Sequence, residues 1–365
     1  MKSAIKFVKI TLWSGLILFA GAVIIRFWFI ESEIAADDPK IQYSGRIDFR
    51  DPKAPVLFWP GTKIVAKFQG SSLKLKMTDQ SGENFYQIIL DDDVAHPIIL
   101  DCLPDTNLYE IASALKDTVH KIEIFRRTET DTGPTVFQGF ILAARKRLVK
   151  PPAPPVRRLE FYGDSITSGL ANECRPGDNP KDESKQNNYL TYGAITARML
   201  NADYVCISKS GIGLMVSWFP LIMPQFYDRL NPTDPQSKWD FTKWQPDAVV
   251  VNLLQNDSWL VHTLQPKPDS MQIIQAYVDF VRQIRRVYPN AAIFCTLGNM
   301  DIILPGQPWP GYVQTAVEQI RKQFADTRVF SFIFSAVNTS SHPTVEEHFE
   351  MADELAEFIR NKLSW

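Results

Sequence analysis

Ser165 has a sequence context that suits a nucleophile acting on an ester carbonyl. It stands in Gly163-Asp164-Ser165, directly after the apolar run RLEFY (158–162). A serine on a tight turn between a strand and a helix presents its hydroxyl at the edge of the sheet. Its own N–H, at the helix start, then points toward developing negative charge. Taken alone the tripeptide is a weak signal, because such triplets occur by chance in many proteins.

Gly211 and Asn256 follow two further apolar runs, DYVCI (203–207) and DAVVVNLL (247–254). A glycine N–H and an asparagine amide can both donate hydrogen bonds to the oxyanion that forms when a carbonyl is attacked. Taken singly, an ordinary loop glycine and an asparagine at a helix N-cap explain these residues equally well.

His342 is one of five histidines and lies between the run RVFSFI (328–333) and the last helical pattern. A surface position is the default for a single histidine, but this placement after a strand makes it a candidate general base. Together the four positions predict Ser165 as nucleophile and His342 as base. They also predict an oxyanion hole formed by Ser165, Gly211 and Asn256.

The elements that would position these residues alternate in type from residue 158 to 365. Five short apolar runs predict strands, at 158–162, 203–207, 247–254, 291–297 and 328–333. Between and after them, apolar residues recur at helical spacing, as in Ile273, Val281 and Ile284. This alternation predicts a parallel sheet covered by helices on both faces, with the active site at the carboxyl ends of the strands.

Residues 41–148 show a different pattern. Segments such as KIVAKF, LKLKM and HKIEIF alternate apolar and polar residues, which predicts an all-β sandwich, and only 109–115 has helix-like spacing. Residues 31–40 are polar and predict a linker. Residues 149–157 are rich in proline and predict an extended spacer between the two domains.

Residues 1–30 predict a membrane segment. Residues 10–25 carry no charge, and Lys2, Lys6 and Lys9 precede them. Residues 7–30 are long enough for a bilayer core of about 30 Å at about 1.5 Å per residue. The positive flank predicts a cytoplasmic N-terminus and exported domains in the cell envelope, periplasmic or extracellular. An uncleaved anchor is favoured over a cleaved signal peptide, which would give a secreted protein.

Composition argues against several other functions. The net charge of −2 gives no electrostatic case for a nucleic-acid partner. The four cysteines show no CxxC spacing, so neither a zinc site nor a redox motif is predicted, and we expect no metal and no cofactor. Cys206 and Cys295 lie inside apolar runs and are expected to be buried thiols, and a single disulfide bridge stays open.

The order Ser, Gly, Asn, His resembles the SGNH, or GDS-type, hydrolase superfamily, over residues 158 to about 362. With YSGRIDF, F-x-G-S-S, HKIEIFRRTE and FQGFIL before it, the chain resembles family 2 carbohydrate esterases over residues 41–362. The resemblance implies a jelly-roll sandwich followed by a flavodoxin-like three-layer α/β domain. It also implies an esterase that removes acetyl groups from acetylated oligo- or polysaccharides through an acyl-enzyme intermediate.

Two positions depart from the pattern of this family. Leu254 stands where glycine commonly opens the asparagine block, and Thr339 stands where an aspartate usually precedes the histidine. A carboxylate would orient the imidazole. Its loss implies a Ser–His dyad, with a backbone carbonyl near Thr339 or Ser340 orienting His342, or else weakened catalysis.

Nearby residues have expected roles of their own. Trp259 should lie near the site, where an indole can stack on a sugar, although a core position is equally compatible with the sequence. Asp164 and Asp257 are expected to bond loop N–H groups rather than react. His348, at the start of the final helix, is expected to be structural.

Other functions remain compatible with this sequence. A non-catalytic glycan-binding envelope protein would fit the missing aspartate and the sandwich. A lipase or thioesterase could use the same scaffold, but it needs an extended apolar groove. A polysaccharide O-acetyltransferase would need a multi-pass partner to supply acetyl groups across the membrane.

Overall fold

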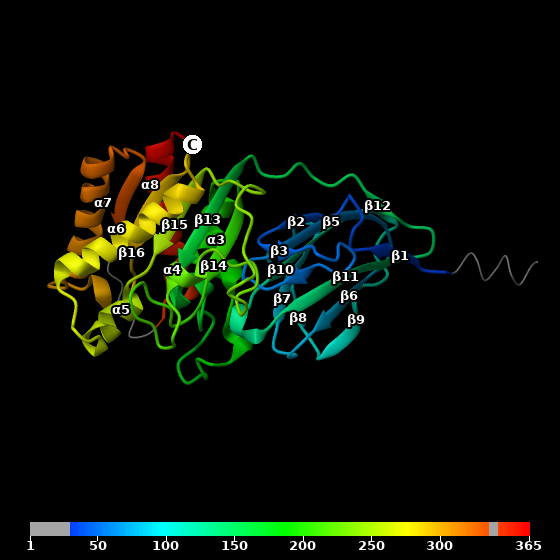
Figure 1. The fold of residues 1–365 in the computed structure, drawn as a ribbon. Coiled ribbons are helices and arrows are strands. Elements are labelled where there is room, and N and C mark those ends of the chain that lie inside the picture. Colours follow the sequence, from blue (N-terminus) through cyan, green and yellow to red (C-terminus); the bar gives the residue numbers. More distant parts are fainter. Residues whose placement is uncertain (1–29, 336–341) are drawn as a thin grey trace, which may run out of the picture.

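The computed structural model describes residues 30–335 and 342–365 (Figure 1). The predicted membrane segment therefore lies, but for Ile30, outside the described residues. Among the residues that are described, no helix is both long and apolar enough to cross a bilayer.

The first part of the described chain is a β-sandwich, as the alternating pattern predicts. Two antiparallel six-stranded sheets face each other around one apolar core that includes Phe68, Tyr86 and Phe137. One sheet contains β1 (Ser32–Ala35), β3 (Ile47–Asp48), β4 (Val56–Leu57), β6 (Leu73–Asp79), β9 (Asp105–Ala112) and β11 (Thr135–Leu142). The other contains β2 (Gln42–Ser44), β5 (Lys63–Gly70), β7 (Phe85–Leu90), β8 (Ile98–Asp101), β10 (Thr118–Arg126) and β12 (Leu148–Val149).

Two expectations about this region were wrong. Residues 31–40 are not only a linker, because strand β1 lies within them and pairs with β11. The helix-like spacing at 109–115 belongs to strand β9 and the turn after it. Strand β9 is mostly exposed, so its polar and apolar residues are not sorted by a buried face, and the period of two is weak.

The second part is an α/β region built on a parallel five-stranded sheet with the order β14-β13-β15-β16-β17. All five predicted strands are present. They are β13 (Arg157–Gly163), β14 (Ala202–Ser208), β15 (Ala248–Asn252), β16 (Ala292–Leu297) and β17 (Val329–Ile333). Strands β15 and β16 are buried on both faces, which explains why they read as continuous apolar runs rather than alternating ones.

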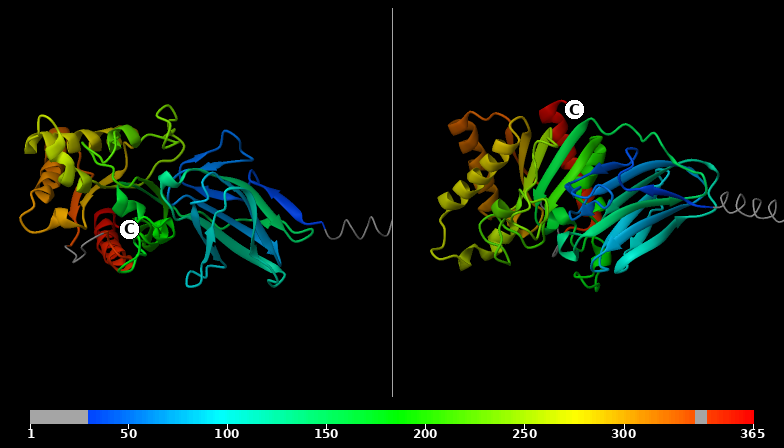
Figure 2. Two further views of the ribbon diagram at one scale, coloured as in Figure 1. Left: turned by 90° about the horizontal axis from the view of Figure 1, so that it is seen from below. Right: turned by 45° about the vertical axis from the view of Figure 1, so that its right-hand side comes forward.

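Helices cover both faces of this sheet (Figures 1 and 2). One apolar core joins the sheet to α6 (Ser270–Val287) and α7 (Trp309–Phe324), and another joins it to α3 (Tyr192–Met199) and α8 (Val345–Leu363). The remaining helices are short: α2 (Ser165–Ser168), α4 (Met223–Phe226) and α5 (Gln255–Leu260), with 3₁₀ turns η1 (Thr130–Thr132), η2 (Glu183–Lys185), η3 (Asn188–Leu190), η4 (Val261–Thr263) and η5 (Asp301–Ile303).

The sandwich and the α/β region share a buried ionic contact. Arg46 of the sandwich reaches Glu160 on β13 at 2.9 Å and the Tyr162 hydroxyl at 2.8 Å, and neither charged side chain is exposed. Its guanidinium also donates to the backbone carbonyls of Tyr227 and Arg229. Separating the two parts would leave these charges without partners, so the contact favours one fixed arrangement.

Candidate active site

The sheet order brings the predicted residues to one point at the edge of the sheet. Strand β13 lies between β14 and β15, and the chain passes first outward to β14 and then back across β13 to β15, β16 and β17 on its other side. In open parallel sheets, ligands bind outside the carboxyl ends of the strands at this reversal. Ser165 follows β13 and Asn256 follows β15, so both residues lie just past the carboxyl ends of the two strands at this reversal.

Ser165 and His342 meet at this edge. His342 Nε2 lies 2.8 Å from Ser165 Oγ, although the residues are 177 positions apart. Ser165 is the first residue of α2, and the Asp164 carboxylate caps that helix by accepting from the Ile166 N–H at 3.0 Å. Gly163 has no room for a side chain, because a Cβ there would lie 1.9 Å from Thr167 Oγ1. The Gly-Asp-Ser sequence thus gives close packing, a helix cap and a hydroxyl at the sheet edge.

His342 is held by the start of α8. Thr344 is the N-cap of that helix and forms a reciprocal capping box with Glu347, which fixes where the helix begins, three residues after His342. Burial lowers the pKa of His342 below its ordinary 6.5, because the protonated ring loses solvation. The imidazole is therefore neutral near pH 7, the form a general base needs. Thr339 and Ser340, the predicted orienting positions, lie outside the described residues.

His348 is structural, as expected. Its side chain is buried, and its Nδ1 accepts a hydrogen bond from the Tyr192 N–H at 3.2 Å. Burial, with a smaller effect from His342, lowers the pKa of His348 to about 3. His348 therefore stays neutral and joins α8 to α3.

Gly211 occupies the loop after β14 with φ +79°, a conformation that glycine adopts freely. Within the described part of the chain, the backbone N–H groups of Gly211 and Ser165 have no hydrogen-bond acceptor. The N–H of the neighbouring Ser210 donates to the buried carboxylate of Glu129, which belongs to the sandwich, at 2.8 Å. Glu129 was not found from the sequence, because nothing in its local pattern indicates a contact 81 residues away.

Asn256 lies beside the nucleophile turn. Its Nδ2 donates to the Ile212 carbonyl at 2.9 Å and lies 3.5 Å from the Asp164 carboxylate. Its Oδ1 accepts from the indole N–H of Trp218 at 3.0 Å. The amide nitrogen, which is the donor end, therefore lies beside Asp164, the residue before Ser165.

Asp164 and Asp257 bond loop N–H groups, as expected. The buried Asp257 carboxylate accepts from the N–H groups of Leu214, Met215 and Val216 at 2.6–3.1 Å. Burial raises the pKa of Asp257, while those N–H groups oppose the shift. Burial also raises the pKa of Asp164 to about 7, with a smaller contribution from the nearby Asp257 charge.

Leu254 adopts a left-handed backbone conformation. It has φ +92°, in the left-handed region that a branched residue rarely adopts, and its side chain is fully buried. The local chain therefore has the turn that a glycine would give, formed here by a residue with a buried side chain.

Trp259 is half-buried on α5, and its indole N–H donates to the Asp301 carboxylate at 2.9 Å. Gln255 donates to the other oxygen of the same carboxylate at 2.8 Å. The hydrogen bond of Trp259 thus links α5 to η5, and it does not involve Ser165 or Asn256. The expected sugar contact of Trp259 stays a prediction.

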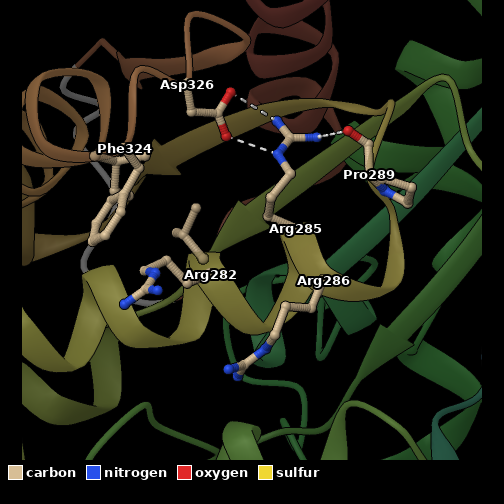
Figure 3. A pocket seen from close by; sticks show the side chains of 8 residues that line it. Arg282, Arg285, Arg286, Pro289, Phe324 and Asp326 are labelled. Atoms are coloured by element: carbon tan, nitrogen blue, oxygen red, sulfur yellow. Dashed lines mark hydrogen bonds and ion pairs between the residues drawn. The ribbon is translucent and has the colours of Figure 1, made fainter.

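A separate pocket of about 390 Å³ lies at the opposite end of the sheet (Figure 3). Its residues Pro289 and Asp326 come just before β16 and β17 begin, whereas Ser165 follows a strand that has ended. Three arginines of α6 line it, and Arg285 is already bonded to Asp326 and to three backbone carbonyls. This pocket therefore offers no group for attack on an ester.

Neither a metal-binding cluster nor a disulfide is found among the described residues. Within them, no group of three or more histidine, cysteine or acidic side chains could hold a metal ion. All four cysteines are free thiols, with Cys206 and Cys295 buried as expected and Cys102 unpaired with Cys174.

Two family models match consecutive parts of the chain. The carbohydrate esterase 2 N-terminal family matches residues 43–152, and the GDSL-like lipase/acylhydrolase family matches residues 161–349. The two matched segments correspond to the sandwich and to the α/β region that carries Ser165.

Curated relatives and solved structures agree with these matches. The cellulase/esterase CelE of Acetivibrio thermocellus is 33% identical over 90% of this chain, which spans 40% of that protein's length. An acetylxylan esterase/glucomannan deacetylase of Cellvibrio japonicus is 30% identical over 91% of both chains. A family two carbohydrate esterase from Clostridium thermocellum, solved with cellohexaose, is 34% identical with a TM-score of 0.79, over 89% of this chain and 99% of that one. This chain, with its sandwich and its GDSL-like region in the same order, therefore belongs to the family 2 carbohydrate esterases and is a carboxylic ester hydrolase.

Proposed function

We propose that this protein removes acetyl groups from O-acetylated saccharides through an acetyl-enzyme intermediate on Ser165. The observation that carries the proposal is the 2.8 Å contact between Ser165 Oγ and His342 Nε2 at the carboxyl edge of the sheet. The names of the relatives, an acetylxylan esterase/glucomannan deacetylase among them, support acetylated saccharides as the substrate class.

In the first step, Ser165 Oγ attacks the carbonyl carbon of the acetyl group while its proton moves to His342 Nε2. The carbonyl oxygen takes up negative charge and accepts hydrogen bonds from the N–H groups of Ser165 and Gly211 and from Asn256 Nδ2. The C–O bond to the sugar then breaks. The imidazolium of His342 gives its proton to the departing sugar oxygen, which leaves as an alcohol.

In the second step, water attacks the acetyl-Ser165 carbonyl and loses a proton to His342 Nε2. The same three donors stabilise the second oxyanion. Collapse breaks the bond between the acetyl carbon and Ser165 Oγ, the proton returns to the serine, and acetate leaves. Each oxyanion donor is typically worth about 10²–10³ in turnover.

A Ser–His dyad is part of the proposal. The segment between Ser335 and His342 is AVNTSS and holds no acidic residue, so no carboxylate comes from the usual position.

The test is acetate release from a panel of acetylated saccharides by the wild type and Ser165→Ala. We expect no release above buffer from Ser165→Ala. Ser168→Ala is the matched control, because Ser168 is a buried serine on the same helix that bonds Ser208 and lies outside the proposed mechanism. Retained hydrolysis in folded Ser165→Ala would refute the assignment of the nucleophile.

The same assay separates the other functions. Binding of saccharide without hydrolysis by the wild type would indicate a glycan-binding protein. Faster cleavage of octanoate than of acetate esters would indicate a lipase or thioesterase. Transfer of the acetyl group to a second saccharide in preference to water would indicate an acetyltransferase.

We also propose that residues 7–30 anchor the protein in a membrane, with the other domains exported. The support is the uncharged stretch at 10–25 and the lysines before it. In cells that make the full chain, the protein should stay in the membrane fraction after alkaline carbonate washing and should be digested by protease added outside. Release of a shortened protein into the medium would instead indicate a cleaved signal peptide.

A further inference from the structure

Trp218 contacts both residues that were assigned to the oxyanion hole beside Ser165. Its backbone N–H donates to the Gly211 carbonyl at 3.1 Å, and its indole N–H donates to Asn256 Oδ1 at 3.0 Å. The ring packs over Gly211 so closely that a Cβ there would lie 3.3 Å from Trp218 Cδ1. One side chain thus joins the loop after β14 to the helix after β15.

From these contacts we infer that Trp218 is a positioning residue that fixes which end of the Asn256 amide faces the substrate carbonyl. An asparagine amide can rotate by half a turn and exchange its donor and acceptor ends at little steric cost. The indole N–H of Trp218 only donates, so it can bond only Oδ1. The Ile212 carbonyl only accepts, so it can bond only Nδ2. Two one-way partners therefore exclude the reversed amide.

The orientation leaves one Nδ2 hydrogen in a long, weak bond that an oxyanion can replace. Nδ2 carries two hydrogens, and the Ile212 carbonyl takes one of them at 2.9 Å. The other lies at a long 3.5 Å from the carboxylate of Asp164, the residue before Ser165. A reversed amide would present Oδ1 to the oxyanion, and two negative oxygens would then repel each other.

The loop that carries Trp218 is itself held in place. Asp257, the residue after Asn256, binds the N–H groups of Leu214, Met215 and Val216. The Gly213 N–H donates to the Ser217 hydroxyl at 2.9 Å. Trp218 nevertheless keeps 63% of its surface exposed, beside a hollow of about 560 Å³. Burial in the core does not explain why a tryptophan stands at position 218. Its hydrogen bond to Asn256 does.

The inference rests on the proposed role of Asn256 as an oxyanion donor, and the test is Trp218→Phe measured alone and in an Asn256→Ala background. Phenylalanine keeps an aromatic ring, so any stacking on a sugar persists and only the indole N–H is lost. We expect kcat to fall about tenfold with KM within about twofold, as for the loss of one orienting hydrogen bond. In Asn256→Ala the same substitution should change kcat less than twofold, because there is no amide left to orient.

Trp59→Phe is the control, since it also removes an indole N–H bond, to the Leu230 carbonyl, and Trp59 has no part in the proposed mechanism, so kcat of the folded variant should stay within about twofold of wild type. A wild-type kcat in Trp218→Phe would overturn the inference, and so would an equal loss in both backgrounds, which would mean that Trp218 acts without Asn256. Loss of activity in Ser165→Ala with a normal Trp218→Phe would overturn only this inference. Activity in Ser165→Ala would overturn the proposed function itself.

Discussion

At the scale of single residues, the state of His342 decides when the proposed nucleophile can be activated. The base must be neutral, and burial lowers the pKa of His342 below 6.5. A lowered pKa means that the neutral form persists into mildly acidic solution, and activity is lost only as the pH falls through that pKa. We therefore expect the acid limb of kcat/KM against pH to have its midpoint below 6.5.

The dependence of kcat/KM on pH should be measured for the Asp164→Asn variant as well as for the wild type. Asp164 has a pKa raised to about 7, so its titration could overlap with that of His342. Asparagine keeps an acceptor oxygen for the Ile166 N–H but does not titrate in this range. If the acid limb in this variant has a midpoint above 7, then a carboxylate supports His342 and the dyad proposal fails.

The four proposed site residues could be predicted from the sequence, because each comes directly after a strand of a parallel sheet or before the final helix. They are Ser165, Gly211, Asn256 and His342. Their positions along the chain therefore predict a common edge. The roles of Trp218 and Glu129 could not be predicted from the sequence. Their roles depend on hydrogen bonds to Asn256 and Ser210, 38 and 81 positions away, and no local pattern specifies those bonds.

At the scale of elements, the turn from β13 into α2 depends on the absence of a side chain at residue 163. A Cβ at Gly163 would meet Thr167 Oγ1 at 1.9 Å and Thr167 Cβ at 2.5 Å, so the first turn of α2 would have to move. We expect Gly163→Ala to lower the free energy of unfolding by about 1–3 kcal/mol, as for overpacking. It should also lower kcat, because Ser165 moves with the turn.

Gly311 on α7 provides the comparison. A Cβ there would meet nothing within 4 Å, so Gly311→Ala should raise the free energy of unfolding by up to about 1 kcal/mol, through better helix propensity. Its activity should equal that of the wild type. Denaturant unfolding and acetate release measured on both variants would check the pair, and equal stabilities would contradict it.

The elements of the α/β region were predictable because most residues of its strands β13 to β16 are buried and the strands stand out as apolar runs. The sandwich was predictable only in part. Strand β9 is mostly exposed, and β1 alternates only between half-buried and exposed residues. Both strands are defined by pairing with β6 and β11 rather than by their own composition.

At the scale of the whole molecule, the sandwich contributes to the site without touching the reacting atoms. Glu129 is buried and accepts the Ser210 N–H at 2.8 Å, one residue before the proposed oxyanion donor Gly211. Asp131, two residues later, forms an ion pair with Lys209 on the same loop. The sandwich therefore holds the position of the loop after β14, and the α/β region alone would lack this support.

The contribution of Glu129 is testable by its removal and its partial restoration. Glu129→Ala takes away the acceptor and leaves the Ser210 N–H without a partner, so the Gly211 loop should loosen and kcat should fall about tenfold. Glu129→Gln keeps an oxygen that can accept this bond and should recover most of the activity. Asp131→Ala breaks an ion pair whose aspartate is 60% exposed, and such pairs contribute little, so its kcat should stay within about twofold of wild type. A normal kcat in folded Glu129→Ala would mean that the loop keeps its geometry without the sandwich carboxylate.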